Sequence, residues 1–495
     1  MVGYKSEKIL ALACLLALAS QAAAENDPIS EPECDDGKTV SIRYSATSAR
    51  LYLEAAIDGE RGGCVTLSQI FTARGGKAPL YAIDPDTDER STTETGTWLL
   101  TESLYVEDGI TLNVHGGDEG NADELRLQSS DDGFINLRGH GGSLSFHSTK
   151  VFAWDEDTKE VHDPSDYEEG RSYISVISEI LQDGQTCDGK AKSEMGEARM
   201  DIVSSDMGYL GYKGSEAYGL TWKVRGFCKD KSNPEIFDDV NVYGNIYDSD
   251  IHHNYFGVYT YGHQQGDWRR NKMRENIQYG FDPHDDSDYL NIHDNEVYGN
   301  GNHGIIASKR CNDVSIQGNT VYDGGQAGLF LHRSSDDAIV KGNNVYNNAD
   351  AGLAMLESFG AVVSENTFTG NKYGVRMSVG CANNEITDNK ITDSTKYNAY
   401  TYKGSDAPDV VDSGYSNTNT YSSNTITGGL ETIKLKESVG MVFTDNTFVD
   451  ATTIRFDDST EVLMAGNTGL DSVTLKVAND ACFASGSDAE FVPTC

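Results

Sequence analysis

The stretch Asn295-Glu296-Val297 returns along the chain as Asn319-Thr320-Val321 and Asn343-Asn344-Val345, an Asn followed two positions later by an apolar residue. The pattern continues, mostly at steps of 22 to 24 residues, at Asn366/Phe368, Asn389/Ile391, Asn424/Ile426 and Asn446/Phe448. A fixed period in this range is typical of a solenoid, in which each repeat buries its apolar face only by stacking on its neighbours. The sequence therefore predicts a repeat fold.

Each repeat contains short β-branched or aromatic segments separated by Asn, Asp and Gly turns, with no room for a helix. This composition favours an all-β chain, a right-handed parallel β-helix, in which Asn side chains at the turns hydrogen-bond along the stack. Leucine-rich repeats are the alternative at this period, but Leu does not recur at fixed offsets.

The remaining segments complete the expected domain organisation. Residues 1–24 resemble a secretory signal peptide, because Lys5 and Lys8 precede a short apolar run. Residues 25–480 are expected to form the β-helix, with the irregular segment 40–235 as its early coils and Thr47–Ile57 as a short N-terminal capping helix. Residues 481–495 are expected to form a tail tethered by a disulfide.

The composition restricts the partners. The formal net charge of −39 argues against a nucleic-acid partner, which needs a basic footprint, and an acidic substrate would need a local basic patch. No later segment is long and apolar enough to span a membrane, so we expect a secreted protein of the cell wall or a periplasm-like compartment. Outside the signal peptide there are eight cysteines, which favours disulfides, Cys482 with Cys495 first among them.

A glycine ladder fixes the register of the strands. It runs through Gly257, Gly280, Gly304, Gly328, Gly352 and Gly374. Positions one and three residues after each Gly are mostly apolar and should point into the core, because strand side chains alternate between faces. Positions two and four residues after each Gly should then face solvent.

The outward positions gather chemistry-bearing residues on one face. The predicted site comprises Tyr259, Tyr261, Tyr279, Asp282, His284, Asp285, Ser308, Lys309, Arg310, His332 and Arg333. Because parallel strands stack about 4.8 Å apart, these residues should form one patch. Aromatic rings, acid–base groups and cations together suit a polymer of sugar acids. Singly, each of these residues could equally be an ordinary surface residue.

The segment Tyr279-Gly280-Phe281-Asp282-Pro283-His284-Asp285 resembles the Asp-Pro-His-Asp signature of the mannuronan C5-epimerases of algal and bacterial periplasmic type. The flanking segments Gly257–Tyr261, His303–Ser308, Trp98–Thr101 and Tyr218–Trp222 are also similar to that family. The resemblance spans about residues 95–395. It implies an isomerase that converts β-D-mannuronate to α-L-guluronate within polymeric alginate.

By motif position, the resemblance implies that His284 is the base that removes the C5 proton. Tyr279 is implied as the acid or as the residue that orders an acidic water, and Asp282 as a group that orients or tunes the site. The carboxylate partner is left open between Lys309, which the glycine register favours, and Arg310.

The remaining site residues, with Ser308 at a position where modular relatives carry Asp, are expected to bind substrate. No cofactor is expected to be required. Calcium stays optional, with Asp285, Asp286 and Asp288 as the local acidic cluster.

Two other functions remain open at the level of sequence. An alginate lyase would abstract the same proton and then eliminate the C4 substituent. A non-catalytic polysaccharide-binding β-helix would use the same face without chemistry. The sequence does not decide the product pattern, processivity, oligomeric state or disulfide pairing.

Overall fold

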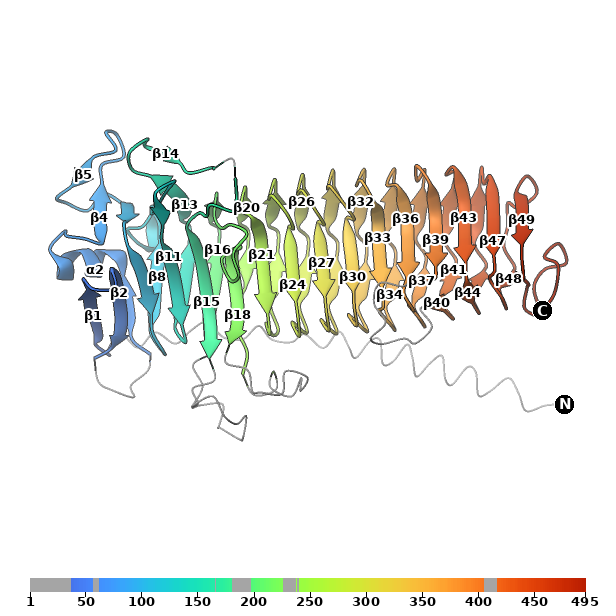
Figure 1. Ribbon diagram of the computed structural model, residues 1–495, viewed down its shortest axis with the longest axis horizontal. Helices are drawn as coiled ribbons and strands as arrows, with labels where there is room; N and C mark the ends of the chain where they lie inside the picture. The colour runs from blue at the N-terminus through green and yellow to red at the C-terminus, as the bar shows by residue number, and fades with distance from the viewer. Residues whose placement is uncertain are drawn as a thin grey trace. The chain divides into compact units, whose positions relative to one another are not determined.

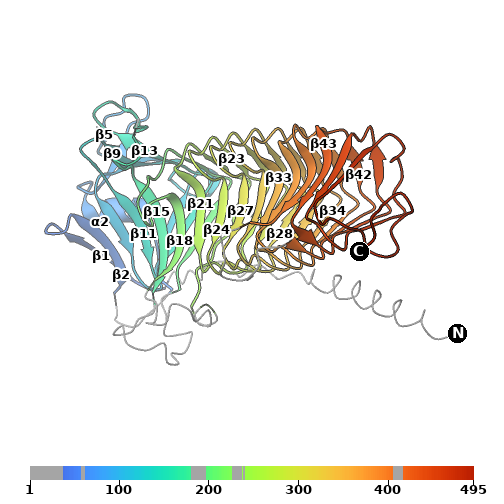
Figure 2. The same cartoon turned by 45° about the vertical axis from the view of Figure 1, so that its right-hand side comes forward.

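The computed structural model describes residues 37–56, 62–164, 166–179, 197–225, 237, 240–404 and 416–495. The proposed signal peptide, residues 1–24, lies outside the described residues, as do Cys34, Cys187 and Cys228. From residue 37 onward the described residues form a right-handed parallel β-helix. Its coils stack on one another, and their strands form three long sheets (Figures 1 and 2).

Sheet A carries the longest strands and is formed, in spatial order, by β1 (Val40–Ser45), β2 (Arg50–Ala55), β7 (Ser103–Val106), β11 (Asn136–His140), β15 (Tyr173–Glu179), β18 (Gly219–Arg225), β21 (Phe256–Tyr261), β24 (Phe281–His284), β27 (Ile305–Ser308), β30 (Leu329–His332), β33 (Ala351–Leu356), β36 (Tyr373–Ser378), β39 (Tyr397–Tyr402), β43 (Glu431–Lys436), β47 (Thr453–Asp457) and β49 (Thr474–Ala478).

Sheet B is formed, in spatial order, by β3 (Cys64–Thr66), β8 (Thr111–His115), β12 (Ser143–His147), β16 (Arg199–Val203), β19 (Ile246–Tyr247), β22 (Asp267–Arg269), β25 (Asn291–His293), β28 (Ser315–Gln317), β31 (Ile339–Lys341), β34 (Val362–Ser364), β37 (Glu385–Thr387), β41 (Thr420–Ser422), β45 (Val442–Thr444) and β48 (Leu463–Ala465).

Sheet C is formed, in chain order, by β4 (Leu80–Ile83), β5 (Arg90–Ser91), β6 (Thr97–Leu100), β9 (Glu124–Ser130), β10 (Gly133–Phe134), β13 (Lys150–Asp155), β14 (Glu160–Val161), β17 (Asp206–Gly208), β20 (Asp250–His252), β23 (Lys272–Arg274), β26 (Glu296–Tyr298), β29 (Thr320–Tyr322), β32 (Asn344–Tyr346), β35 (Thr367–Thr369), β38 (Lys390–Thr392), β42 (Thr425–Thr427) and β46 (Thr447–Val449). Besides these sheets there are a short pair, β40 (Ser416–Asn417) with β44 (Ser438–Val439), the helix α2 (Leu67–Arg74) and the 3₁₀ turn η1 (Gly117–Glu119).

One coil runs through the sheets in the order A, B, C, and the next coil repeats it, as β24, β25 and β26 follow β21, β22 and β23. The residues one and three places after each ladder glycine are buried, as the register predicts; Phe281, Ile305 and Ala307 have no exposed surface. Parallel pairing keeps equivalent residues of successive coils in contact, so that these columns form a continuous apolar core.

The predicted Asn ladder is confirmed at the turn between sheets B and C. The side-chain amide of Asn295 donates to Asn319 Oδ1 at 2.9 Å and to the carbonyl oxygen of Trp268 at 2.9 Å. Its own Oδ1 accepts from the backbone N of Asn271 at 2.9 Å. Each Asn thus satisfies buried polar groups of the coils beside it, which explains why the sequence repeats this residue at one phase.

The predicted capping helix is misplaced. Residues 50–55 form strand β2, antiparallel to β1, because Leu51 and Leu53 alternate with half-buried residues and both enter the core. The helix α2 lies later in the chain; Thr66 caps its N-terminus in a capping box with Gln69. Its Phe71 packs edge-on against Trp98, with ring centroids 5.4 Å apart.

The disulfide prediction is confirmed. Cys482 and Cys495 form the predicted disulfide in the tail, and Cys64 is also disulfide-bonded. Cys311 and Cys381 are free and fully buried in the core. The sequence left the pairing of the other cysteines open, and these two thiols serve as small apolar side chains.

Candidate functional site

The site predicted from the glycine register lies on the outer face of sheet A, around β24 near the middle of the stack (Figure 1). Tyr261 pairs with His284, His284 with Ser308, and Ser308 with His332 on successive strands. Two residues earlier on the same two strands, Tyr259 pairs with Asp282. Stacking therefore brings together residues that are more than twenty positions apart in the sequence.

The prediction that the position two residues after each glycine faces solvent is wrong for the central coils. Asp282 is only 3% exposed, and Ile306 and Phe330 are 5% and 8% exposed. Ile306 and Phe330 belong to a second apolar cluster, separate from the core inside the coils, together with Ala327, Ala351, Ala354, Leu356, Tyr373 and Val379. The site therefore has an apolar floor.

Asp282 is the most deeply buried acid of the site. Its Oδ1 makes no hydrogen bond among the described residues. Burial raises the pKa of Asp282 to about 7; the charges of His284 and Lys309 oppose the rise, and Asp285 adds to it. An acid with this pKa changes charge near neutrality, which is common for functional groups.

His284 stands at the end of β24 and is half-buried. Its Nδ1 lies against the carboxylate of Asp285, the next residue in the chain. On its other side the ring of Tyr259 lies with its centroid 5.6 Å from that of the imidazole. A carboxylate on one ring nitrogen fixes the orientation of an imidazole and leaves the other nitrogen for proton transfer.

Asp285 stays ionised in spite of its burial. Burial raises the pKa of this carboxyl, but His284 and the cations of the next coil outweigh it, so that the pKa is lowered overall. Lys309 Nζ lies 3.9 Å from its Oδ2, and Arg310 Nη2 lies 3.0 Å from its Oδ1.

Lys309 and Arg310 differ in how they are held. Arg310 donates from Nε to Asp286 Oδ1 at 3.0 Å and from Nη2 to Asp286 Oδ2 at 2.8 Å, in addition to its contact with Asp285. Within the described residues, Lys309 makes one long ion-pair contact, with Asp285. The structure thus places Arg310 in a fixed network and leaves Lys309 the more weakly held cation.

Tyr279 lies two residues before β24, at the opposite end of this strand from His284. Its ring packs edge-on against Phe256 at 4.8 Å and stacks on His303 at 5.7 Å. Burial and the charge of Asp282 raise the pKa of Tyr279, so that its phenol stays protonated. His303 is neutral, because burial lowers its pKa to about 4, and its Nδ1 accepts from the backbone N of Ala327.

His332 and Arg333 close the site one coil beyond Lys309. His332 Nδ1 lies 2.8 Å from Ser308 Oγ, and burial together with the charge of Arg333 lowers the pKa of His332 to about 3. His332 is therefore a neutral hydrogen-bonding group. Arg333 follows it in a left-handed backbone conformation with φ of 56°, at the same place in its coil as Lys309, whose φ is 62°.

The sequence analysis missed two residues of this face, Lys223 and Tyr218. Lys223 pairs with Tyr261, and its Nζ lies 5.5 Å above that ring and 3.2 Å from Glu216. Burial raises the pKa of Tyr218, and Asp282 adds to the rise, so this phenol also lies near the buried acid. A bulge between Gly219 and Leu220 breaks the register in this coil, so the glycine ladder does not predict which of its residues face outward.

The acidic cluster considered for calcium is largely occupied by protein groups. Asp285 and Asp286 both contact Arg310, and Asp288 accepts from the backbone N of Asn312 at 2.7 Å. Within the described residues no group of three or more His, Cys, Asp or Glu side chains is arranged to hold a metal ion. The carboxylates of Asp285 and Asp286 thus bind an arginine of the protein itself.

Comparison with known proteins supports both the fold and the resemblance. A family model described as a right-handed β-helix region matches residues 236–358 and 306–414. Over 255 residues the chain is 29% identical to the mannuronan C5-epimerase of Pseudomonas aeruginosa, and over 224 residues 29% identical to mannuronan C5-epimerase AlgG of Azotobacter vinelandii. The chain is related to the mannuronan C5-epimerases. These matches cover 51% and 45% of the chain and 39% and 37% of the two relatives.

The solved structures extend the likeness to these epimerases in fold. The crystal structure of the periplasmic alginate epimerase AlgG superposes with a TM-score of 0.63 at 17% identity, covering 91% of this chain and 96% of that one. At that identity the superposition shows a common architecture. Among the described residues, no helix of this chain is both long and apolar enough to cross a bilayer.

Proposed function

We propose that this protein is a mannuronan C5-epimerase, which converts β-D-mannuronate to α-L-guluronate residues within polymeric alginate. The observation that carries the proposal is the His284–Asp285 pair beside Lys309, at a half-buried strand end of the right-handed β-helix region. We further propose that the protein acts outside the cytoplasm, where such a polymer is accessible.

In the proposed reaction, Nε2 of His284 accepts the proton from C5 of a mannuronate residue. Asp285 stabilises the imidazolium that results, since it is held ionised beside Nδ1. The electron pair left at C5 delocalises into the adjacent carboxylate. The negative charge on that carboxylate needs a cation to stabilise it. Lys309 can supply this cation because it makes one long ion pair, whereas Arg310 is held by Asp286.

Return of a proton to the opposite face of C5 completes the epimerisation. Asp282 lies between Tyr279 and His284 along the strand, so a sugar over Asp282 would have one of these two groups at either end. The raised pKa of Tyr279 keeps the phenol able to donate. The phenolate of Tyr279 regains a proton from solvent and the imidazolium of His284 releases the one that it accepted, so atoms and charges balance without an oxidant or a cofactor.

The test is incubation of the full secreted chain with polymannuronate in heavy water, followed by proton NMR. We expect new guluronate signals with deuterium at C5, and no signals or ultraviolet absorbance of unsaturated chain ends. His284→Ala should abolish both the conversion and the exchange. His293→Ala is the matched control, because His293 lies on β25 of the same coil but on sheet B.

Dominant unsaturated ends would overturn the proposal in favour of a lyase, in which the electrons at C5 expel the C4 substituent. Absence of any conversion by a folded protein would favour a non-catalytic binding protein. We also propose that no metal takes part, and expect activity to survive treatment with EDTA and to gain nothing from added calcium.

A further inference from the structure

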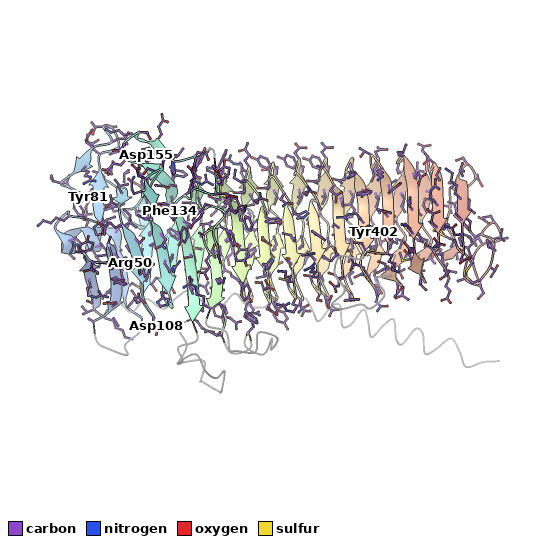
Figure 3. All side chains as sticks on the ribbon, in the orientation of Figure 1. Arg50, Tyr81, Asp108, Phe134, Asp155 and Tyr402 are labelled. Atoms are coloured by element: carbon purple, nitrogen blue, oxygen red, sulfur yellow. A yellow bond between two sulfur atoms is a disulfide. The ribbon has the colours of Figure 1, made fainter. Side chains whose placement is uncertain are left out.

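A group of four tyrosines lies on the outer face of sheet A well away from His284. Tyr373 begins β36, and Tyr397, Tyr400 and Tyr402 lie on β39. The ring centroids of Tyr373 and Tyr400 are 5.4 Å apart, those of Tyr397 and Tyr400 5.0 Å, and those of Tyr400 and Tyr402 4.8 Å. Tyr402 is labelled on the face of the C-terminal coils that is turned toward the viewer in Figure 3. We call these four residues the tyrosine platform.

Lysines lie over the rings of the platform. Lys372 Nζ is 5.3 Å from the ring centre of Tyr373, and Lys396 Nζ is 5.5 Å from Tyr373 and 5.2 Å from Tyr397. Lys434, on the next strand, is 5.5 Å from Tyr397. Lysines held against aromatic faces keep their charged ends in solvent while the rings limit their motion.

Arginines complete the positive charge of this region. Arg376 donates to the hydroxyl of Tyr402 at 3.2 Å and pairs with Asp350 at 3.0 Å. Arg455 pairs with Glu431 at 2.9 Å. These two acids are outnumbered by the cations named here, in a protein whose net charge is −39. A concentration of positive charge against that background marks a place where an anion is favoured.

The platform continues the columns that carry the proposed active site. One column of paired residues runs across sheet A from His284 through Ser308, His332, Leu356 and Ser378 to Tyr402. A second column of paired residues runs from Phe330 through Ala354, Arg376 and Tyr400 to Lys434. Five strand steps separate His284 from Tyr402, or about 24 Å at the usual spacing. A linear polymer lying across the strands at His284 would pass directly over the platform.

Covering the outer apolar cluster would explain Tyr373, which is buried, and Tyr397 and Tyr400, which pack against the cluster, but not Tyr402 or the lysines. Tyr397, Tyr400 and Tyr402 are half-exposed, and a cover needs no lysines aligned on it. Flat aromatic faces suit the C–H faces of sugar rings, while the cations suit their carboxylates. The tyrosines and the lysines therefore both suit a polymer of sugar acids.

We propose that the tyrosine platform is a remote subsite that holds an anionic polysaccharide, several sugar residues along the same polyuronate chain that reacts at His284. This rests on the proposed function for the identity of the polymer. The subsite adds affinity for long chains and takes no part in the chemistry, because it lies far from the reacting carbon.

The test compares Lys396→Gln/Lys434→Gln with wild type in steady-state kinetics on long polymannuronate. We expect KM to rise roughly tenfold with kcat unchanged, since uniform binding would be lost. The rise should shrink at high salt, because it is electrostatic. Lys272→Gln/Lys390→Gln is the matched control, as both lysines are exposed on sheet C, and it should leave KM unchanged. Tyr402→Ala tests the aromatic contribution and should raise KM severalfold.

Binding of polymannuronate to the His284→Ala protein, measured by affinity electrophoresis, separates the two proposals. Weaker binding of the lysine variant in this background supports the subsite even if no epimerisation is ever observed. Epimerisation with the same KM and the same binding in platform and control variants overturns the subsite and leaves the proposed function intact. A fall in kcat at unchanged KM also overturns it.

Discussion

Two His–Asp pairs lie on one coil in different surroundings. His284–Asp285 ends β24 on sheet A, and His293–Asp294 ends β25 on sheet B; in both, the Asp faces Nδ1 of the preceding imidazole and has a left-handed backbone. Asp285 is 14% exposed, whereas Asp294 is 62% exposed. The same dipeptide at the same kind of strand end thus provides a candidate catalytic base in one place and a surface ion pair in the other.

The neighbouring coils create this difference. Lys309 and Arg310 of the next coil lower the pKa of Asp285. His293 instead contacts Asp267 of the preceding coil at 3.0 Å, and its hydrogen bonds to Asp267 and Asp294 raise the pKa of His293. A raised pKa leaves less of His293 in the neutral form that a base requires, so the structure directs attention to the sheet A pair.

The largest expected effect separates the two pairs in activity. Asp285→Asn removes the carboxylate beside His284, so we expect kcat/KM on polymannuronate to fall by about 10²–10⁴-fold. Asp294→Asn, the matched change on sheet B, should leave kcat/KM unchanged. Equal effects of the two substitutions would remove the distinction between the pairs.

The next effect is on the pH dependence of stability and arises from Asp282. Because its pKa is raised to about 7, the folded state holds a proton that the unfolded state releases near pH 4. The free energy of unfolding should therefore fall as the pH rises between about pH 4 and pH 7, with this residue contributing at most about 1.4 kcal/mol per pH unit.

The measurement is urea unfolding of wild type and Asp282→Asn across that range. Subtracting one curve from the other cancels the contributions of other titrating groups, including the buried His263, whose pKa burial lowers to about 3. A difference curve that is flat with pH would show that Asp282 titrates normally.

A smaller effect tests the scaffold that both pairs share. Asn295 follows Asp294 and satisfies the buried groups of two neighbouring coils. Asn295→Ala should lower the free energy of unfolding by about 1–3 kcal/mol, measured by urea denaturation, because buried partners lose their hydrogen bonds. Asn302→Ala, at a half-exposed position, should have a much smaller effect. A similar loss from both would refute the importance of the ladder.

The smallest effect belongs to His293 itself. Its pKa is raised in the folded state, so its stabilisation is present below the unfolded pKa and is lost as the pH rises through the folded value. His293→Gln should therefore destabilise the protein by less than about 1 kcal/mol at pH 5.5 and by nothing measurable at pH 9. Thermal unfolding at the two pH values checks this, and a loss that is larger at pH 9 would contradict it.

The sequence predicted the architecture through features that repeat. Asn295 and its equivalents, and the glycines before each sheet A strand, revealed the coil length, the core columns and the outward columns. The prediction failed where the repeat is irregular, as at Thr47–Ile57, where alternating Leu51 and Leu53 form a strand. A segment that occurs once has no equivalent in other coils to confirm its secondary structure, whereas residues that recur in every coil confirm one another.

For the candidate site, the sequence determined which side chains stack on one face, because parallel pairing converts a fixed step in the chain into contact in space. It missed Lys223 and Tyr218, whose coil contains a bulge. It also predicted solvent exposure for Asp282, which neighbouring coils bury.

By itself, then, the sequence determined the β-helix, its register and the position of the His284 segment on sheet A. Only the tertiary structure decided that Asp282 is buried, that Arg310 is bound to Asp285 and Asp286, and that the tyrosine platform lies on the same face. The physical reason is that burial and charge pairing depend on side-chain contacts between coils, whereas the coil itself is specified by residues close together in the chain.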